Sequence, residues 1–131
     1  EIFGGSIDEN VHLNRSQIRA LDVREALDAV GLLDEVLKLP DGLNTFLQTG
    51  GAPLSGSQAL RLMLARAIVG QPRLLLIDGT LDALADRDAG SILTRLLAKE
   101  MPWTLLVATG RQQVVEACER CLELAPANAS K

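Results

Sequence analysis

Leu54-Ser55-Gly56-Ser57-Gln58, followed about twenty residues later by Leu74-Leu75-Leu76-Ile77-Asp78, decides the fold of this chain. The first stretch is a small polar loop before an apolar-periodic helix that runs to about Val69, with Ser55 as its N-cap. The second is an aliphatic strand that ends in a carboxylate, a pattern typical of a parallel strand covered on both faces. Together they predict a nucleotide-phosphate site made of two separate pieces.

The first half of the chain reads as helical, and the second half alternates strand and helix as a parallel sheet does. Gly31 is expected to stop the first long helix, and residues 1–10 and 45–53 read as loops. Helices are expected over residues 16–30, 86–99 and 112–117, and strands over 103–108 and 121–124. The sequence therefore predicts a helical subdomain over residues 1–70, an α/β core over 71–125 and a disordered tail over 126–131.

Composition excludes several classes of protein. With 47% hydrophobic but only 2% aromatic residues, the 131-residue chain suits a helix-rich α/β fold better than a β-sandwich. A net charge of −4 without a Lys/Arg cluster gives no sign of nucleic-acid binding. No apolar run approaches the roughly 18 residues of a membrane span, and no signal peptide opens the chain. We expect a cytoplasmic protein that a partner carries to any membrane.

The cysteine and histidine residues carry little chemistry. Cys118 and Cys121 form a CxxC motif, but with one histidine in the chain there are too few ligands for a structural zinc. The motif also leads into the expected strand at 121–124, unlike a thioredoxin-type pair, so two small buried or half-buried thiols are expected. His12 has no plausible serine or cysteine partner to activate, which argues against a catalytic triad.

Five ordered pieces of the chain, at family spacing, resemble the C-terminal half of the nucleotide-binding domain of ATP-binding cassette (ABC) transporters of the exporter type. The likeness covers the chain from Ile2 to about Leu124. Its pieces are Ile2–Val11, Leu39–Thr45, Gly51–Gln58 with the family signature, Leu64–Ala67, and Pro72–Asp78 with the Walker B strand. The resemblance implies a P-loop NTPase-like parallel-sheet half-core with an α-helical subdomain, the phosphate-loop half being absent.

By this resemblance, Ser55 and Gly56 contact the γ-phosphate of an ATP held mainly by an opposing subunit, and Ser57 and Gln58 complete the signature loop. Asp78 corresponds to the Walker B acid, which holds Mg²⁺, usually through water. From the residues alone, Ser55 is more simply read as an ordinary N-cap, and Asp78 can also be a strand-end turn cap. Ser57 stands where the family has glycine, at a cost of about 1 kcal/mol if the site needs positive φ or tight backbone contact.

Several family positions carry other residues. Gly79 replaces the glutamate that acts on the attacking water, and Gly110 replaces the switch histidine. Two more acidic positions differ from the family. The acid of the loop after the Walker B strand falls on Ala85, although a one-residue slip would place it on Asp86, and the acid before the signature falls on Thr49. No G-x-x-x-x-G-K-[ST] phosphate loop occurs in these residues. We therefore expect this chain alone to bind ATP weakly and to hydrolyse little of it.

Three interpretations follow. The chain is part of the ATP-binding domain of an exporter on the cytoplasmic side of the membrane, coupling ATP binding and hydrolysis to transport. Its partners would be a second nucleotide-binding domain, identical or different, and a transmembrane domain, with the phosphate loop expected upstream of Glu1. Alternatively, it is a catalytically inactive cassette that serves as a regulatory or protein-interaction module. An unrelated binding domain with the same motif order is the third.

Exposed sheet edges predict self-association or marginal stability of the isolated piece.

Overall fold

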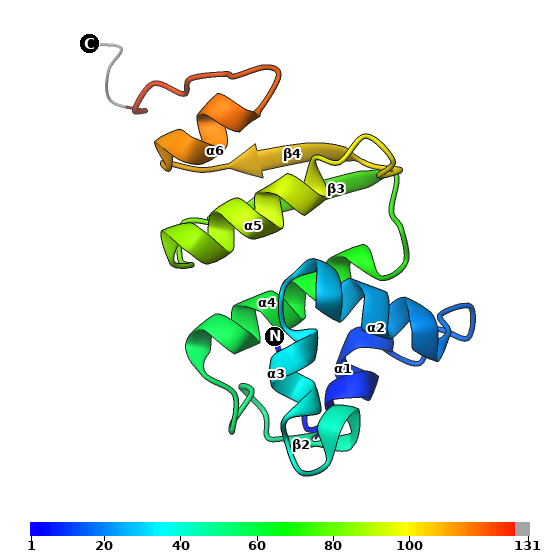
Figure 1. Ribbon diagram of the computed structural model, residues 1–131. Helices are drawn as coiled ribbons and strands as arrows, with labels where there is room; N and C mark the ends of the chain where they lie inside the picture. Colours follow the sequence, from blue (N-terminus) through cyan, green and yellow to red (C-terminus); the bar gives the residue numbers. More distant parts are fainter. Residues whose placement is uncertain (128–131) are drawn as a thin grey trace.

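The computed structural model describes residues 1–127 and contains short antiparallel and parallel sheets among six helices in that range. The elements follow in the order β1 (Gly5–Ser6), α1 (Ile7–His12), α2 (Ala20–Ala29), α3 (Leu33–Leu37), a 3-10 turn (Gly42–Asn44), β2 (Phe46–Leu47), α4 (Gly56–Ile68), β3 (Leu74–Asp78), α5 (Asp86–Leu96), β4 (Thr104–Ala108) and α6 (Gln112–Ala117). Figure 1 shows α1 to α4 gathered in one part of the molecule and β3 to α6 in the other. Within residues 1–127, none of the helices combines the length and the apolar character needed to cross a bilayer.

The segment at the start of the chain is not the loop that the sequence indicated. Ser6 caps α1, because its Oγ accepts a hydrogen bond from Glu9 N at 3.1 Å while Glu9 Oε2 accepts one from Ser6 N at 2.8 Å. This Ser-x-x-Glu capping box stabilises a helix of only six residues, and it was readable in the sequence. Residues 45–53 likewise contain β2, which pairs antiparallel with β1.

The helix after the signature loop forms as expected. α4 spans Gly56–Ile68, with Ser55 as N-cap, and buries Leu62, Leu64 and Ala65 against α1 and α2. Near its other end Arg66 reaches α1, where its Nε donates to Asn10 O at 2.7 Å and its Nη2 to Asn10 Oδ1 at 2.9 Å. The loop before α4 therefore leads into a helix that packs against α1 and α2.

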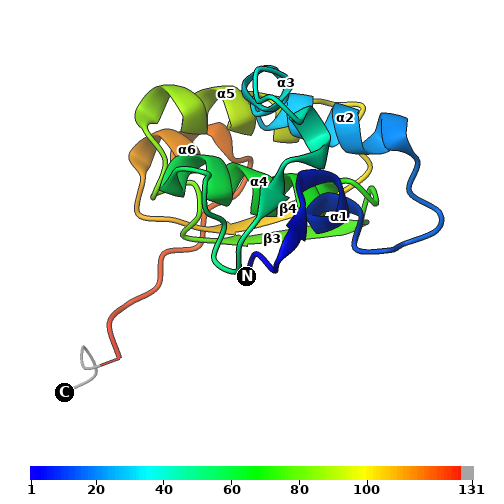
Figure 2. The same ribbon diagram turned by 90° about the horizontal axis from the view of Figure 1, so that it is seen from below.

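The second part of the molecule contains the predicted parallel sheet. β3 and β4 pair in parallel from Leu74 with Thr104 to Asp78 with Ala108. Figure 2 shows the helices on one side of this sheet. Leu75 and Ile77 of β3 belong to the hydrophobic core and are only 3% and 4% exposed. Because β3 and β4 run in the same direction, their carboxyl ends meet at one edge, where residues 78–82 and 109–111 lie together.

The expectation that β3 is covered on both faces is wrong for the described residues. The side chains of Leu74, Leu76 and Leu106 on the second face are 54%, 63% and 63% exposed. An all-aliphatic strand indicates hydrophobic side chains on both faces, but it carries no information about what covers each of them.

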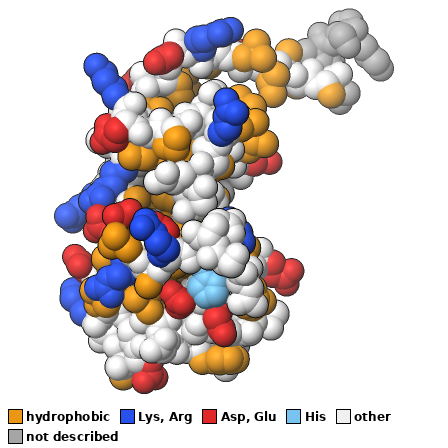
Figure 3. Space-filling model, turned by 90° about the vertical axis from the view of Figure 1, so that its right-hand side faces the viewer, with side chains coloured by type: hydrophobic (Ala, Val, Ile, Leu, Met, Phe, Trp, Pro, Cys, Tyr) orange, Lys and Arg blue, Asp and Glu red, His pale blue; other side chains and the backbone are white. Residues whose placement is uncertain are grey.

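The two parts of the molecule meet along α2 and α5. Arg95 Nη1 of α5 lies 2.8 Å from Asp28 Oδ2 of α2. Within the second part, Trp103 Nε1 donates to the carbonyl of Leu96, the last residue of α5, at 2.9 Å. Figure 3 shows acidic, basic and hydrophobic side chains intermixed along one side of the molecule, where the two parts join at a narrower waist.

The end of the chain departs from the sequence prediction. Residues 121–124, expected to form a strand, have no regular secondary structure, and Leu122 and Leu124 are 85% and 83% exposed. Both cysteines are free thiols. Cys118 is half-buried as expected, but Cys121 is exposed. Most of the tail expected over 126–131 lies outside the described residues, which end at 127.

Candidate functional site

The signature loop, residues 55–58, forms the amino end of α4. Ser55 Oγ accepts a hydrogen bond from Gln58 N at 3.2 Å, and Gln58 Oε1 accepts one from Ser55 N at 2.9 Å. The loop is therefore closed by a reciprocal capping box in which glutamine takes the place of the more usual glutamate. Ser55 acts as the N-cap, as the residues alone had allowed.

Hydrogen-bond donors at this helix end remain free for a ligand. Ser55 and Gly56 are exposed, and the N–H groups of Gly56 and Ser57 form no hydrogen bond within the described part of the chain. The first N–H groups of a helix have no intrahelical acceptor, and the positive end of the helix dipole favours an anion beside them. Because Ser55 Oγ uses a lone pair for the cap, its hydroxyl proton is also free to donate.

Ser57 does not carry the backbone strain that the sequence had suggested as one possibility. It lies inside α4, and it is not among the residues with positive φ. Serine at this position therefore does not require a strained, left-handed backbone conformation. A side chain at Gly56 would meet nothing within 4 Å, so the loop is open to its surroundings there.

Asp78 ends β3 at the carboxyl edge of the sheet and is exposed. It is paired in register with Ala108 of β4, and the next residue, Gly79, donates its N–H to Ala108 O at 3.0 Å. Gly79 has φ +70°, in the left-handed region where glycine is favoured and a side chain is strained. The absence of a second acid is thus matched by a backbone conformation suited to glycine.

Asp82 occupies this edge, a residue that the sequence analysis did not single out. Its carboxylate accepts hydrogen bonds from Gly110 N at 2.7 Å and from the Thr109 hydroxyl. The Thr109 hydroxyl, then the Gly110 N–H, hold the pKa of Asp82 below its ordinary range. The position of the missing switch histidine is therefore tied to an acidic side chain from the loop after β3.

Arg111 joins the same two loops through backbone carbonyls. Its Nη2 donates to Asp82 O at 3.0 Å and to Leu84 O at 2.5 Å, and its Nη1 lies 3.2 Å from Asp86 Oδ1. Asp86, the neighbour of Ala85, lies in the first turn of α5 beside this guanidinium. Thr49, where the sequence lacks a further acid, is exposed before the signature loop.

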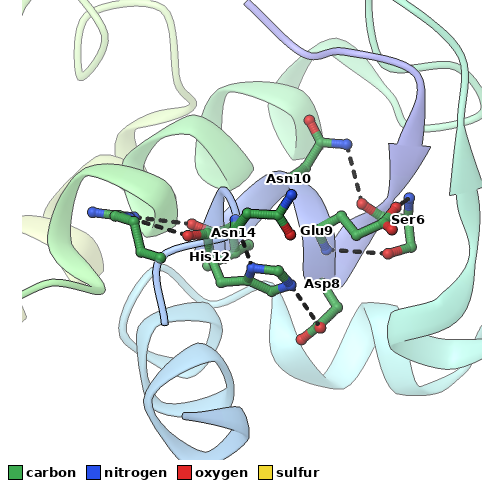
Figure 4. Close-up of polar contacts among 8 residues, drawn as sticks. Ser6, Asp8, Glu9, Asn10, His12 and Asn14 are labelled. Carbon is green, nitrogen blue, oxygen red and sulfur yellow. Dashed lines mark hydrogen bonds and ion pairs between the residues drawn. The ribbon is translucent and has the colours of Figure 1, made fainter. Parts of the chain in front are cut away.

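His12 is engaged in local structure on α1. Figure 4 shows its imidazole between the carboxylate of Asp8, 3.3 Å from Nε2, and the backbone of Asn14, whose N–H donates to Nδ1 at 2.9 Å. Asp8 lies one helical turn before His12, so this i, i+4 pair belongs to the surface of α1. Both nitrogens of the imidazole therefore have partners within residues 8–14.

The chain offers a partial fit to ATP and Mg²⁺. Residues 55–58 supply the donors that an anion needs, and Asp78 supplies one exposed carboxylate at a sheet edge. Among residues 1–127, no group of three or more His, Cys, Asp or Glu side chains could hold a metal ion by itself. One carboxylate is compatible with Mg²⁺, which usually keeps several waters and takes phosphate oxygens as further ligands.

Sequence reasoning missed the groups that brace the signature loop. Glu35 on α3 accepts a hydrogen bond from Gln58 Nε2 at 2.7 Å, and Arg61 on α4 lies 2.9 Å from the other oxygen of Glu35. Arg61 is only 7% exposed, and a charged residue on the buried side of an amphipathic helix needs a partner. That mismatch was the one available signal, but it did not identify Glu35.

Comparison with known proteins gives a consistent result. The chain is 36% identical over 126 residues to an ATP-dependent lipid A-core flippase of Burkholderia orbicola, covering 94% of this chain and 21% of the flippase. It is 34% identical over 119 residues to the alpha-factor-transporting ATPase of Saccharomyces cerevisiae, covering 89% of this chain and 9% of the ATPase. The chain therefore spans only a small part of the length of these relatives. No family model matches it.

A solved structure agrees with these relatives. A bacterial Atm1-family ABC exporter with ATP bound superposes with a TM-score of 0.73 at 29% identity, over 82% of this chain and 19% of the exporter chain. Together, the helical part and the parallel sheet with its helices form the α/β architecture of a P-loop NTPase-like fragment. The chain belongs to the ABC transporter family and corresponds to the C-terminal half of an exporter-type nucleotide-binding domain.

Proposed function

We propose that residues 55–58 act as the signature loop of an exporter and close against an ATP held by a second nucleotide-binding domain. The amino end of α4 carries this proposal, because its exposed N–H groups and serine hydroxyl donate outward from a firmly capped helix. Closure of two such domains would be passed to a transmembrane domain and drive export. The chain would then work on the cytoplasmic side of the membrane, held there by its transmembrane partner or by a further part of the protein.

The residues of this chain have separate roles in the proposal. When bound, MgATP supplies the negative charge that draws the two domains together and the energy of the transport cycle. Ser55 would donate its hydroxyl proton, and Gly56 and Ser57 their N–H groups, to phosphate oxygens. Asp78, at the edge of the sheet, would accept a hydrogen bond from a magnesium-bound water. These assignments rest on the resemblance together with the exposure and the free donors described above.

We also propose the division into a helical subdomain over residues 1–70 and a core over 71–125. The open face of the sheet supports the idea that further protein completes the core. Leu74, Leu76 and Leu106 form an exposed aliphatic surface that a folded domain rarely leaves in water. The relatives of this chain are several times longer, so they contain material that could cover it.

The test uses the full-length transporter that carries these residues and measures the distance between its two nucleotide-binding domains as ATP is added. Ser55→Asp keeps a good N-cap but directs a carboxylate at the triphosphate, so the ATP concentration for half-closure should rise about a hundredfold or more. Ser6→Asp is the matched control, because Ser6 caps α1 with the same reciprocal geometry. Equal midpoints for Ser55→Asp, Ser6→Asp and the unmodified protein would refute the proposal.

A second function, a cassette that binds or regulates without turnover, is favoured by the edge of the sheet. Gly79 and Gly110 offer no side chain for moving a proton, and the carboxylate of Asp82 is engaged by Thr109 and Gly110. Loss of two proton-handling groups, each worth roughly 10² to 10⁴ in rate, leaves little hydrolysis. The ATPase rate of the full-length protein decides this point, since turnover abolished by Asp78→Asn would contradict an inactive site.

A further inference from the structure

The side chain of Gln58 is held from two sides in a single orientation. Its Oε1 accepts the hydrogen bond from Ser55 N at 2.9 Å, and its Nε2 donates to Glu35 Oε2 at 2.7 Å. A backbone N–H can only donate and a carboxylate can only accept, so the amide cannot turn over without placing two donors face to face at Ser55. The geometry of the signature loop is thus connected to a residue twenty-three positions earlier in the chain.

Glu35 is itself fixed by the buried side of α4. Its Oε1 accepts from Arg61 Nη1 at 2.9 Å, and the same Nη1 donates to Gly31 O at 2.7 Å. Arg61, and after it the amide of Gln58, lowers the pKa of Glu35 despite the opposing effect of burial. The carboxylate therefore stays ionised and acts as an acceptor on both of its oxygens.

We infer that Glu35 is a positioning residue for the signature loop, which acts through Gln58 on the N–H of Ser55. This inference rests on the proposed function, because positioning matters only if residues 55–58 meet a nucleotide. Arg61 orients Glu35, Glu35 orients the amide of Gln58, and that amide holds the first residue of the capping box. The arrangement pre-forms the loop, so closure on ATP would not have to order it.

The hydrogen-bond pattern makes a sharp substitution possible. Both neighbours of Glu35 are donors, so Glu35→Gln keeps the size of the side chain but presents a donor to Arg61 or to Gln58. The double variant Glu35→Gln with Gln58→Glu restores every donor–acceptor pair. In it, the new amide at position 35 would donate to the new carboxylate at position 58 and accept from Arg61. The net charge is unchanged in the double variant, and both side chains keep their length.

The experiment measures two quantities on the full-length transporter: amide hydrogen exchange at Ser55 without nucleotide, and the ATP midpoint of domain closure. Glu35→Gln should speed exchange at Ser55 and raise the midpoint about tenfold, and the double variant should recover most of both changes. Asp22→Asn is the control, because it removes an acid paired with Arg19 on the same helical part, far from the loop in sequence. Its thermal unfolding midpoint should match that of the other variants closely enough to separate positioning from stability.

Two results would overturn the inference: a Glu35→Gln protein whose Ser55 exchange and ATP midpoint are unchanged, or a double variant no better than the single one. The Ser55→Asp variant keeps this outcome separate from the proposed function. If Ser55→Asp weakens closure and Glu35→Gln does not, only the role of Glu35 falls. If Ser55→Asp has no effect, the proposed function falls, and the positioning role falls with it.

Discussion

The amino end of α4 and the carboxyl edge of the β3–β4 sheet use their polar groups in opposite ways. At the amino end of α4, the side chains of residues 55, 58 and 35 hydrogen-bond to the loop and to one another, and the N–H groups of Gly56 and Ser57 have no partner among residues 1–127. At the sheet edge, the carboxylate of Asp82 accepts hydrogen bonds from its own chain at Thr109 and Gly110.

The difference shows that groups suited to binding a phosphate and groups suited to reacting with it lie in separate regions. A braced helix end with free donors is suited to holding an anion that another domain brings. An edge with glycine at residues 79 and 110 offers no side chain there to position or deprotonate water. Under the proposed function, we expect the chain to complete a partner's nucleotide site rather than to hydrolyse a nucleotide at its own edge.

The largest effect on stability should follow from Asn10→Ala, which tests the support of the signature helix. Asn10 is fully buried; its Nδ2 donates to Phe3 O and Ser6 O, and its Oδ1 accepts from Phe3 N and Arg66 Nη2. Removing the amide leaves these groups without their hydrogen-bond partner and should lower the free energy of unfolding by about 3 kcal/mol. Chemical denaturation measures this free energy, and Asn44→Ala at an exposed position is the control. A decrease of less than about 1 kcal/mol for Asn10→Ala would contradict the proposed support of α4.

An intermediate effect should distinguish the glycines of the two regions. Gly79 has φ +70°, so Gly79→Ala should cost about 1 kcal/mol even though a Cβ there meets nothing within 4 Å. Gly56 also has open space but lies in the first turn of α4, so Gly56→Ala should stabilise the protein by about 0.5 kcal/mol. Thermal unfolding should show a lower midpoint temperature for Gly79→Ala and a higher one for Gly56→Ala. Changes in the same direction would contradict the difference between the two backbone conformations.

The smallest effect should be a titration at the sheet edge. Hydrogen bonds lower the pKa of Asp82 in the folded protein. The stabilisation of the fold by its ionised carboxylate is therefore complete above the ordinary pKa of 3.8, and it is lost as the pH falls through the lowered pKa of the folded state. The amide resonance of Gly110, followed by NMR from neutral to acid pH, should therefore shift with an inflection below 3.8. Asp82→Asn should abolish the inflection. An inflection at or above the ordinary value would mean that Asp82 does not accept from Gly110.

Sequence patterns predicted the elements with strong local signals. The helix from Ser55 to about Val69 and the parallel pair of strands formed where expected, because a cap, an apolar stripe and an aliphatic run each act over a few residues. The covering of β3 was mispredicted, since a strand does not encode which layer packs on each face. The strand expected at 121–124 is absent from the described chain, because a strand needs a neighbour that its own residues cannot supply.

The candidate site divides in the same way. Ser55, Gly56 and Asp78 stand in short motifs, so the family resemblance was enough to single them out as candidates, although the residues alone also fit an N-cap and a turn cap. Glu35 and Asp82 act through partners that lie 23 and 28 positions away along the chain, and no local pattern brings such pairs together. Only the approach of Glu35 on α3 to Gln58 and Arg61 on α4, and the parallel register of β3 and β4, make those contacts visible.

A structure of the full-length transporter with a non-hydrolysable ATP analogue decides whether residues 55–58 bind a nucleotide held by a partner. We predict a γ-phosphate oxygen at about 3 Å from Ser55 Oγ or from the N–H of Gly56, with the analogue held mainly by the opposing domain. A closed, nucleotide-bound dimer in which residues 55–58 face solvent and contact no phosphate would contradict it.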